Sequence, residues 1–190
     1  MAYLYFITYF APAPAIHLYC LMEIAQAIAL IKNGIDSTIA QTWADFGCGA
    51  GTFTYALAEC LPAGSIIYAI DAVQQNLAAY RNNIKINFEK ANFEKDVLQL
   101  PLLDGILMAN ALHYVKEQNI FLEKAAQYFS GNKKLLIVEY DTSASNQWVP
   151  FPINFSSLKT LLMETGYRKV EKLGQFNSAF GGKMYAVVAY

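Results

Sequence analysis

The sequence predicts an α/β protein built on a doubly wound, mostly parallel sheet of seven strands with helices on both faces. Short apolar runs such as SIIYAI and LLIV alternate with segments of helical periodicity. Continuous apolar strands of this kind are typical of parallel sheets that are covered on both sides. Three glycines follow the first strand, where a parallel sheet binds its ligand. Gly181-Gly182 separates the last two strands and predicts a C-terminal antiparallel hairpin.

The elements follow one another with recognisable start and stop signals. Apolar residues three and four positions apart predict helices, and Asn-Gly, Pro or Gly residues end them. The predicted strands are 42–46, 65–70, 84–88, 105–109, 135–140, 167–176 and 184–189. The predicted helices are 21–31, 53–61, 73–80, 119–130 and one around 158–162, the last capped by Ser156 or Ser157 and closed by Gly166.

The composition is that of a single domain without a nucleic-acid footprint. A chain of 190 residues that is 55% hydrophobic can bury one substantial core. The net charge of −1, with no basic cluster, argues against a duplex nucleic-acid partner. A charged fraction of only 15% favours a partner subunit, and so a possible homodimer. The three cysteines form no C-x-x-C pair, which predicts neither a metal site nor a disulfide framework and favours the cytoplasm.

Residues 1–21 differ from the rest of the chain. They contain no Asp, Glu, Lys or Arg, and five of the first ten residues are aromatic. The missing basic start argues against a secretory signal, and Pro12 and Pro14 argue against a membrane span. We interpret 1–21 as an extension, either a misassigned start before Met22 or an arm that packs on the domain or a partner. Residues 22–190 are then one domain.

The segment 41–57, QTWADFGCGAGTFTYAL, carries the strongest functional signal. An apolar strand with Asp45 near its end runs into Gly47, Gly49 and Gly51, and a predicted helix begins directly afterwards. Glycines permit positive φ and close approach of the backbone to a ligand. A helix that starts there directs its unpaired N–H groups into the loop. The segment therefore predicts a ligand-binding turn.

Asp71 ends the next predicted strand, twenty residues after Gly51. An acidic residue at this place can accept hydrogen bonds from both hydroxyls of a ribose, as in Rossmann-like folds. The turn and Asp71 together predict a site for an adenosine-containing cofactor. The dinucleotide fingerprint needs a glycine where Thr52 stands, which argues against a nicotinamide cofactor.

The pattern D-x-G-x-G-x-G, starting at Asp45, resembles motif I of the class I S-adenosylmethionine-dependent methyltransferases. Three further segments resemble the same family in the same order. Asp71 matches its ribose-binding acid. The run 103–115, LDGILMANALHYV, is similar to its fourth strand and following loop, and 138–167 is similar to its fifth strand, substrate-side loop and last helix. The resemblance covers Thr42–Tyr190 and implies a small, single-domain methyltransferase that uses S-adenosylmethionine.

The resemblance also implies roles for individual residues. Asp45 positions the cofactor's ammonium group over the glycine turn, Asp71 binds the ribose, and the loop after the third strand contacts the adenine. Many members have Asp where this chain has Asn92, so a weaker contact to the base is expected. The implied cofactor-binding residues are Asp45, Gly47, Gly49, Gly51, Asp71, Ala72, Asn92, Phe93, Asn110 and Ala111.

Catalysis in this family is a direct methyl transfer, so the protein contributes mainly alignment. His113 and Tyr140 are the candidate catalytic residues, as a base and as an acceptor-orienting group. The alternative for His113 is a structural histidine that is hydrogen-bonded to backbone. The expected acceptor is a small molecule. Two other functions stay open: a non-catalytic cofactor-binding or scaffold protein of the same fold, and a nicotinamide-dependent oxidoreductase.

Overall fold

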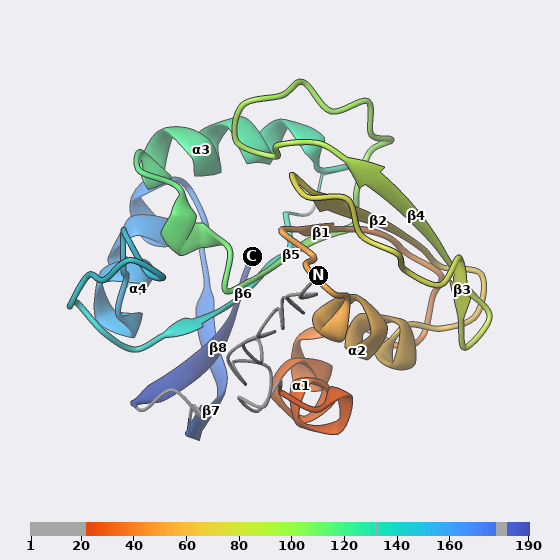
Figure 1. Ribbon diagram of the computed structural model, residues 1–190, viewed down its shortest axis with the longest axis horizontal. Coiled ribbons are helices and arrows are strands. Elements are labelled where there is room, and N and C mark those ends of the chain that lie inside the picture. The colour runs from red at the N-terminus through yellow and green to blue at the C-terminus, as the bar shows by residue number, and fades with distance from the viewer. Residues whose placement is uncertain (1–21, 132, 178–181) are drawn as a thin grey trace, which may run out of the picture.

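The computed structural model of the protein describes residues 22–131, 133–177 and 182–190. Its strands are β1 (Thr42–Phe46), β2 (Ile66–Asp71), β3 (Tyr80–Arg81), β4 (Ile84–Lys90), β5 (Gly105–Ala109), β6 (Leu135–Tyr140), β7 (Val170–Asn177) and β8 (Lys183–Ala189). They form one eight-stranded sheet in the order β3-β4-β2-β1-β5-β6-β8-β7 (Figure 1). The interpretation of 1–21 lies outside the described residues.

The middle of the sheet is parallel and its two edges are antiparallel. Strands β4, β2, β1, β5 and β6 run in the same direction. At one edge β8 pairs antiparallel with both β6 and β7, and at the other β3 pairs antiparallel with β4. The predicted α/β sheet with its C-terminal hairpin is therefore confirmed, with eight strands in place of seven.

Helices cover both faces of the sheet. They are α1 (Ile24–Ile31), α2 (Thr52–Cys60), α3 (Gln118–Ala125) and α4 (Phe155–Glu164), with single 3-10 turns at Lys32–Gly34, Leu112–Tyr114 and Ala126–Tyr128. Figure 1 shows α1 and α2 on one face and α3 and α4 on the other. The first pair packs around Trp43 and Leu57, and the second pair packs around Phe121 and Leu158. Each face of the sheet thus buries its own apolar core.

The helix predicted over 73–80 is wrong. The chain between β2 and β4 is irregular until it forms the short strand β3. Val73 and Tyr80, two of the three residues of the expected apolar stripe, are each 65% exposed. Asn82 and Asn83 both have positive φ and link β3 to β4 as a two-residue hairpin. An irregular segment, followed by the Asn-Asn hairpin, therefore replaces the expected helix.

Most other elements lie where the sequence predicts them. The bounds of β1, β5 and β6 agree with the predicted strands, and Gly166 ends α4 with a φ of +92°. The predicted cap of α4, Ser156 or Ser157, is wrong. The side chain of Asn154 caps the helix by accepting a hydrogen bond from the Ser157 N–H. The predicted helix 119–130 is α3 up to Ala125 and then continues as a 3-10 turn.

The sheet order creates a crevice beyond the carboxyl end of β1. From β1 the chain crosses to β2 and β4 on one side, and β5 and β6 lie on the other side. Ligands of open α/β sheets bind at such a switch in strand order, because the loops after the two central strands diverge there. The loops after β1, β2, β4, β5 and β6 therefore define the functional site.

Candidate active site

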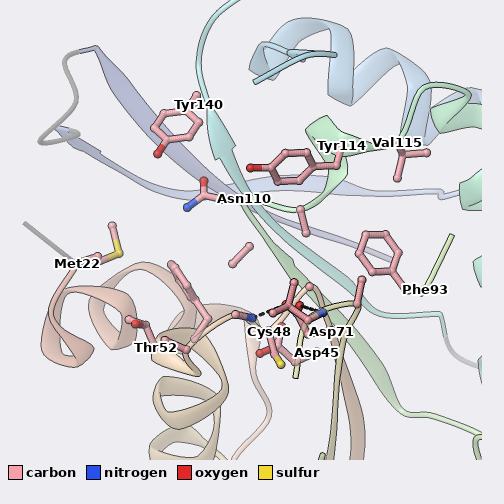
Figure 2. Close-up of a pocket in the computed structure, with 18 of the residues that line it drawn as sticks. Met22, Asp45, Cys48, Thr52, Asp71, Phe93, Asn110, Tyr114, Val115 and Tyr140 are labelled. Carbon is pink, nitrogen blue, oxygen red and sulfur yellow. Dashed lines mark hydrogen bonds between the residues drawn. The ribbon is translucent and has the colours of Figure 1, made fainter. Parts of the chain in front are cut away.

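A cavity of about 920 Å³ opens at this switch point (Figure 2). One side, the β1–β4 wall, comes from the loops after β1, β2 and β4: Asp45, Gly47, Cys48, Gly49, Ala50, Thr52, Phe53, Asp71, Ala72, Val73, Asn92, Phe93, Glu94 and Lys95. The other side, the β5–β8 wall, comes from β5 to β8, from α1, which packs on α2, β7 and β8, and from Met22 just before α1: Met22, Gln26, Ala109, Asn110, Ala111, Tyr114, Val115, Tyr140, Phe176, Asn177 and Met184.

The glycine turn after β1 forms the floor of the cavity. Gly47, Gly49 and Gly51 all have positive φ; Gly47 and Gly49 line the cavity, whereas Gly51 is the N-cap of α2 and is not a lining residue. A Cβ on Gly47 would lie 2.7 Å from the Cβ of Ala111, so the turn packs directly against the loop after β5. No atom lies within 4 Å of a Cβ built on Gly49, which leaves open space at that point of the cavity lining.

Asp71 ties the first two loops together. Its Oδ2 accepts a hydrogen bond of 2.8 Å from the Gly49 N–H, and its Oδ1 accepts one of 2.8 Å from the Val73 N–H. Figure 2 shows Asp71 next to Asp45 and Cys48 at the floor. Each carboxylate oxygen has a second lone pair, so Asp71 retains two acceptor positions for ligand hydroxyls.

Asp45 is buried at the end of β1 with one carboxylate oxygen unpaired. Its Oδ2 accepts a hydrogen bond of 2.6 Å from the Thr54 hydroxyl, whereas Oδ1 has no partner among the described residues. Burial raises the pKa of Asp45 to about 7; the Thr54 hydroxyl opposes this shift and the nearby Asp71 carboxylate adds to it. An orphaned buried oxygen in a cavity wall is a binding position for a donor that the protein itself does not supply.

Asn110 offers a second unpaired acceptor across the cavity. It has a φ of +53°, and its backbone N–H donates to the Val138 carbonyl at 2.8 Å. Its side-chain Oδ1 is buried without a partner among the described residues. Figure 2 shows its side chain directed into the cavity from the β5–β8 wall. Asp45 and Asn110, which line the same cavity, therefore each have one buried side-chain oxygen without a partner among the described residues.

The loop after β4 forms the far end of the β1–β4 wall. The Phe93 ring stacks on Phe46, with centroids 5.8 Å apart and planes within 5°. Asn92 lies beside it, but its Oδ1 already accepts hydrogen bonds from the Glu94 and Lys95 N–H groups at 3.0 and 3.1 Å. Asn92 thus holds the turn of its own loop, and Phe93 supplies a fixed apolar face.

His113 does not line the cavity. It is 2% exposed, and its Nδ1 lies 2.7 Å from Oε2 of Glu139, a residue that is fully buried. Its backbone N–H also donates to Oε1 of Glu139, at 3.2 Å. Tyr140, the other candidate catalytic residue, does line the cavity. The structure thus separates the two: His113 joins the loop after β5 to the end of β6, and Tyr140 faces the ligand space.

Sequence reasoning missed Tyr114, which lines the cavity beside Asn110 and is 54% exposed. Its ring centroid lies 4.4 Å from that of His113. The sequence did not show which of the neighbouring residues His113 and Tyr114 points into the cavity, because both lie in a 3-10 turn and not in a strand with alternating sides. The only available signal was its position, one residue after His113 at the carboxyl end of β5.

Cys48 is an inert part of the turn. It is 7% exposed, and its pKa is raised far above the ordinary value, first by burial and then by the Asp45 and Asp71 carboxylates. It therefore stays a protonated thiol, not a thiolate nucleophile. Among the described residues, no group of three or more His, Cys, Asp or Glu side chains could hold a metal ion. Within the same residues, no helix is both long and apolar enough to cross a membrane.

A family model described as a methyltransferase domain matches residues 40–177, which include the whole glycine turn and most of both cavity walls. The chain belongs to the methyltransferase domain family. The assignment predicted from the D-x-G-x-G-x-G motif is therefore confirmed. No curated protein sequence matches the chain at a significant level.

Solved structures show the same fold at low sequence identity. A SAM-dependent methyltransferase from Aquifex aeolicus is 18% identical with a TM-score of 0.60, covering 87% of this chain and 92% of that one. The 1,6-didemethyltoxoflavin-N1-methyltransferase from Burkholderia thailandensis is 15% identical with a TM-score of 0.66, covering 87% and 76%. Human N-acetylserotonin methyltransferase is 17% identical with a TM-score of 0.62, covering 86% and 50%. At these identities the likeness establishes the methyltransferase fold alone.

Proposed function

We propose that the cavity binds S-adenosylmethionine and that this methyltransferase transfers the methyl group to a small molecule. The observation that carries the proposal is the pair of unpaired acceptors, Asp45 Oδ1 and Asn110 Oδ1, on opposite walls of one cavity. An ammonium group offers three N–H donors and a positive charge, which suits one anionic and one neutral acceptor. The bound cofactor supplies a sulfonium methyl group that is open to attack by a nucleophile.

The chain's other residues fit the rest of this ligand. Asp71 keeps two free acceptor positions for the ribose hydroxyls while it holds Gly49 in place. Phe93, stacked on Phe46, offers an apolar face for the adenine ring. Asn92 supports that loop and is a weaker candidate for contact with the adenine ring, because its Oδ1 already accepts hydrogen bonds from two backbone N–H groups. Ala72 and Ala111 also line the cavity.

Catalysis in this proposal rests on alignment. The two walls hold cofactor and acceptor in one cavity, which replaces a bimolecular encounter by a positioned reaction. Tyr140 orients the acceptor from the β5–β8 wall. Because His113 is buried against Glu139, we assign it a structural role rather than that of a base.

The size of the site supports a small acceptor. A cavity of about 920 Å³ is within the usual range for sites that take a cofactor or drug-sized ligand. Two of the similar structures are named for methylation of small molecules, 1,6-didemethyltoxoflavin and N-acetylserotonin. The homodimer and the cytoplasmic location stay predictions from the low charged fraction and the unpaired cysteines.

The first experiment is a thermal-shift series with S-adenosylmethionine, S-adenosylhomocysteine and NAD. A ligand at 100 times its Kd stabilises a protein by about 2.7 kcal/mol, which raises Tm by a few degrees at this size. We expect a shift with the two sulfur compounds only, reduced in Asp71→Ala. A shift with NAD alone would identify a nicotinamide site instead. Binding without methyl transfer to any of a broad set of small molecules would favour a non-catalytic cofactor-binding protein.

A further inference from the structure

The two walls of the cavity differ in charge. Four charged side chains line the cavity, Asp45, Asp71, Glu94 and Lys95, and all four belong to the β1–β4 wall. Asp45 and Asp71 lie at the glycine turn, while Glu94 and Lys95 lie in the loop after β4. Every charged group of the described lining is thus on the side that the proposed cofactor occupies.

The β5–β8 wall contains no charged side chain among its described residues. Its large members are Met22, Tyr114, Tyr140, Phe176 and Met184, and its polar members are amides. An ionised acceptor would therefore lose hydration on this wall without gaining a counter-charge, which is costly.

Two tyrosine rings on this wall are held in place from behind. The His113 ring packs 4.4 Å from the ring of Tyr114 and 6.1 Å from the ring of Tyr140, centroid to centroid. The buried hydrogen bond between His113 Nδ1 and Glu139 Oε2 fixes the His113 ring in turn. In Figure 2 Tyr114 and Tyr140 both lie on the Asn110 side of the cavity, opposite the glycine turn. Positioned aromatic rings favour offset or edge contacts with another aromatic ring.

We propose that the acceptor is an uncharged aromatic molecule with a hydroxyl or ring N–H group, bound against Tyr114 and Tyr140. This inference rests on the methyltransferase function proposed above. The acceptor's lone pair forms the new bond to the methyl carbon while the carbon–sulfur bond breaks, and its electron pair remains on sulfur. The hydroxyl or N–H proton then leaves to water, which reaches the cavity beside the half-exposed Tyr114. The acceptor is uncharged before the transfer and again after its proton has left, so neither the bound acceptor nor the methylated product needs a counter-charge on this wall.

The test is ligand-observed NMR on the protein saturated with S-adenosylhomocysteine. The probes are four matched sets of small molecules: neutral phenols and N-heterocycles, the same rings bearing a carboxylate, the same rings bearing an ammonium group, and their saturated ring analogues. We expect binding to be concentrated in the neutral aromatic set. Binding concentrated in any other set, or no binding by any set, overturns the inference. Calorimetry of S-adenosylhomocysteine alone reports separately on the proposed function.

Variants of Tyr114 make the test specific to this wall. Tyr114→Ala is expected to weaken the neutral aromatic probes by about tenfold, and Tyr114→Phe by much less, because the ring carries the contact. Tyr114→Lys is expected to add carboxylated aromatic probes to those that bind. Tyr80→Ala, an exposed tyrosine outside the cavity, is the matched control and is expected to change nothing. Equal losses in Tyr114→Ala and Tyr80→Ala would contradict the assignment.

Discussion

The two walls of the cavity reach their shapes by different means. The β1–β4 wall is built from backbone turns and carboxylates, with Asp71 joining the Gly49 and Val73 N–H groups across two loops. The β5–β8 wall presents the rings of Tyr114 and Tyr140, and the His113 ring, paired with the buried Glu139, packs against both. A turn whose backbone and carboxylates are fixed by hydrogen bonds suits a ligand that does not vary, such as a cofactor. The tyrosine rings of the β5–β8 wall can be replaced without changing the glycine turn and the carboxylates of the β1–β4 wall.

Among the substitutions that test whether the two walls act independently, His113→Ala is expected to have the largest effect, a loss of stability without a loss of cofactor affinity. The substitution leaves the fully buried Glu139 carboxyl without its side-chain partner, which costs roughly 3 kcal/mol of the free energy of unfolding. Affinity for S-adenosylhomocysteine should change by less than about twofold, because His113 does not line the cavity. Denaturant unfolding and calorimetry measure the two quantities. A loss of cofactor affinity with unchanged stability would show that the walls are not independent.

Gly49→Val is the matching change in the β1–β4 wall. The side chain enters space that no protein atom occupies, so it should weaken S-adenosylhomocysteine binding roughly tenfold to hundredfold, the equivalent of about 1–3 kcal/mol of overpacking. Gly166→Val is the control. It also has a positive φ and open space around its Cβ, but it ends α4 outside the cavity. Similar binding by the two variants would remove Gly49 from the site.

Asp45→Asn tests the charge of the same wall. It keeps a hydrogen-bond acceptor near Thr54 but removes the anion, which should weaken S-adenosylhomocysteine binding by about tenfold. In the wild type the affinity should fall as the pH drops below about 7, since protonation of Asp45 removes the charge that binds the ammonium. Calorimetry from pH 5.5 to 8.5 measures this slope, which should be absent from Asp45→Asn. An identical slope in both proteins would assign the titration to another group.

The contribution of Asp45 to the free energy of unfolding of the ligand-free protein should fall with rising pH, whereas its contribution to ligand affinity should rise. The pKa of Asp45 is raised by folding, so its contribution to stability is complete below the ordinary value of 3.8 and is lost as the pH rises through about 7. Urea unfolding of the ligand-free protein at pH 5.5 and 8.5 should therefore show a smaller loss of stability with pH in Asp45→Asn than in the wild type. An equal loss in the two proteins would contradict the raised pKa.

The smallest effect is expected from Cys48→Ala, within the glycine turn itself. Affinity for S-adenosylhomocysteine should stay within about twofold, because a buried, protonated thiol contributes packing and no charge. In the native protein Cys48 should resist iodoacetamide at pH 8, a reaction that needs the thiolate. Peptide mass spectrometry after labelling measures this. Rapid labelling of Cys48 would show that the turn opens on the timescale of the reaction.

The parts of the fold that the sequence predicted are those set by local patterns. Apolar runs located β1, β5 and β6, and the D-x-G-x-G-x-G motif identified the methyltransferase family and the turn that lines the cavity. The helix prediction for 73–80 is wrong because its apolar spacing fits a weak helix, whereas hydrogen bonds to Tyr55 and β4 hold this part of the chain in a non-helical conformation. The Tyr55 hydroxyl accepts from the Ala78 N–H, and the Ile86 N–H donates to the Ala79 carbonyl. Such partners are distant in sequence and leave no periodic signal.

The candidate site also has some features that local sequence patterns predict and others that depend on long-range contacts. By itself the sequence located the glycine turn and Asp71 of the β1–β4 wall, because a positive-φ turn needs glycine and a strand-end acid stands at a fixed spacing from it. Only the tertiary structure decided that His113 is buried, because its partner Glu139 lies 26 residues away. It also decided that Tyr114 faces the cavity and that all four charged lining residues lie on one side. Strand order creates that separation of charge, and strand order depends on long-range pairing that no local pattern encodes.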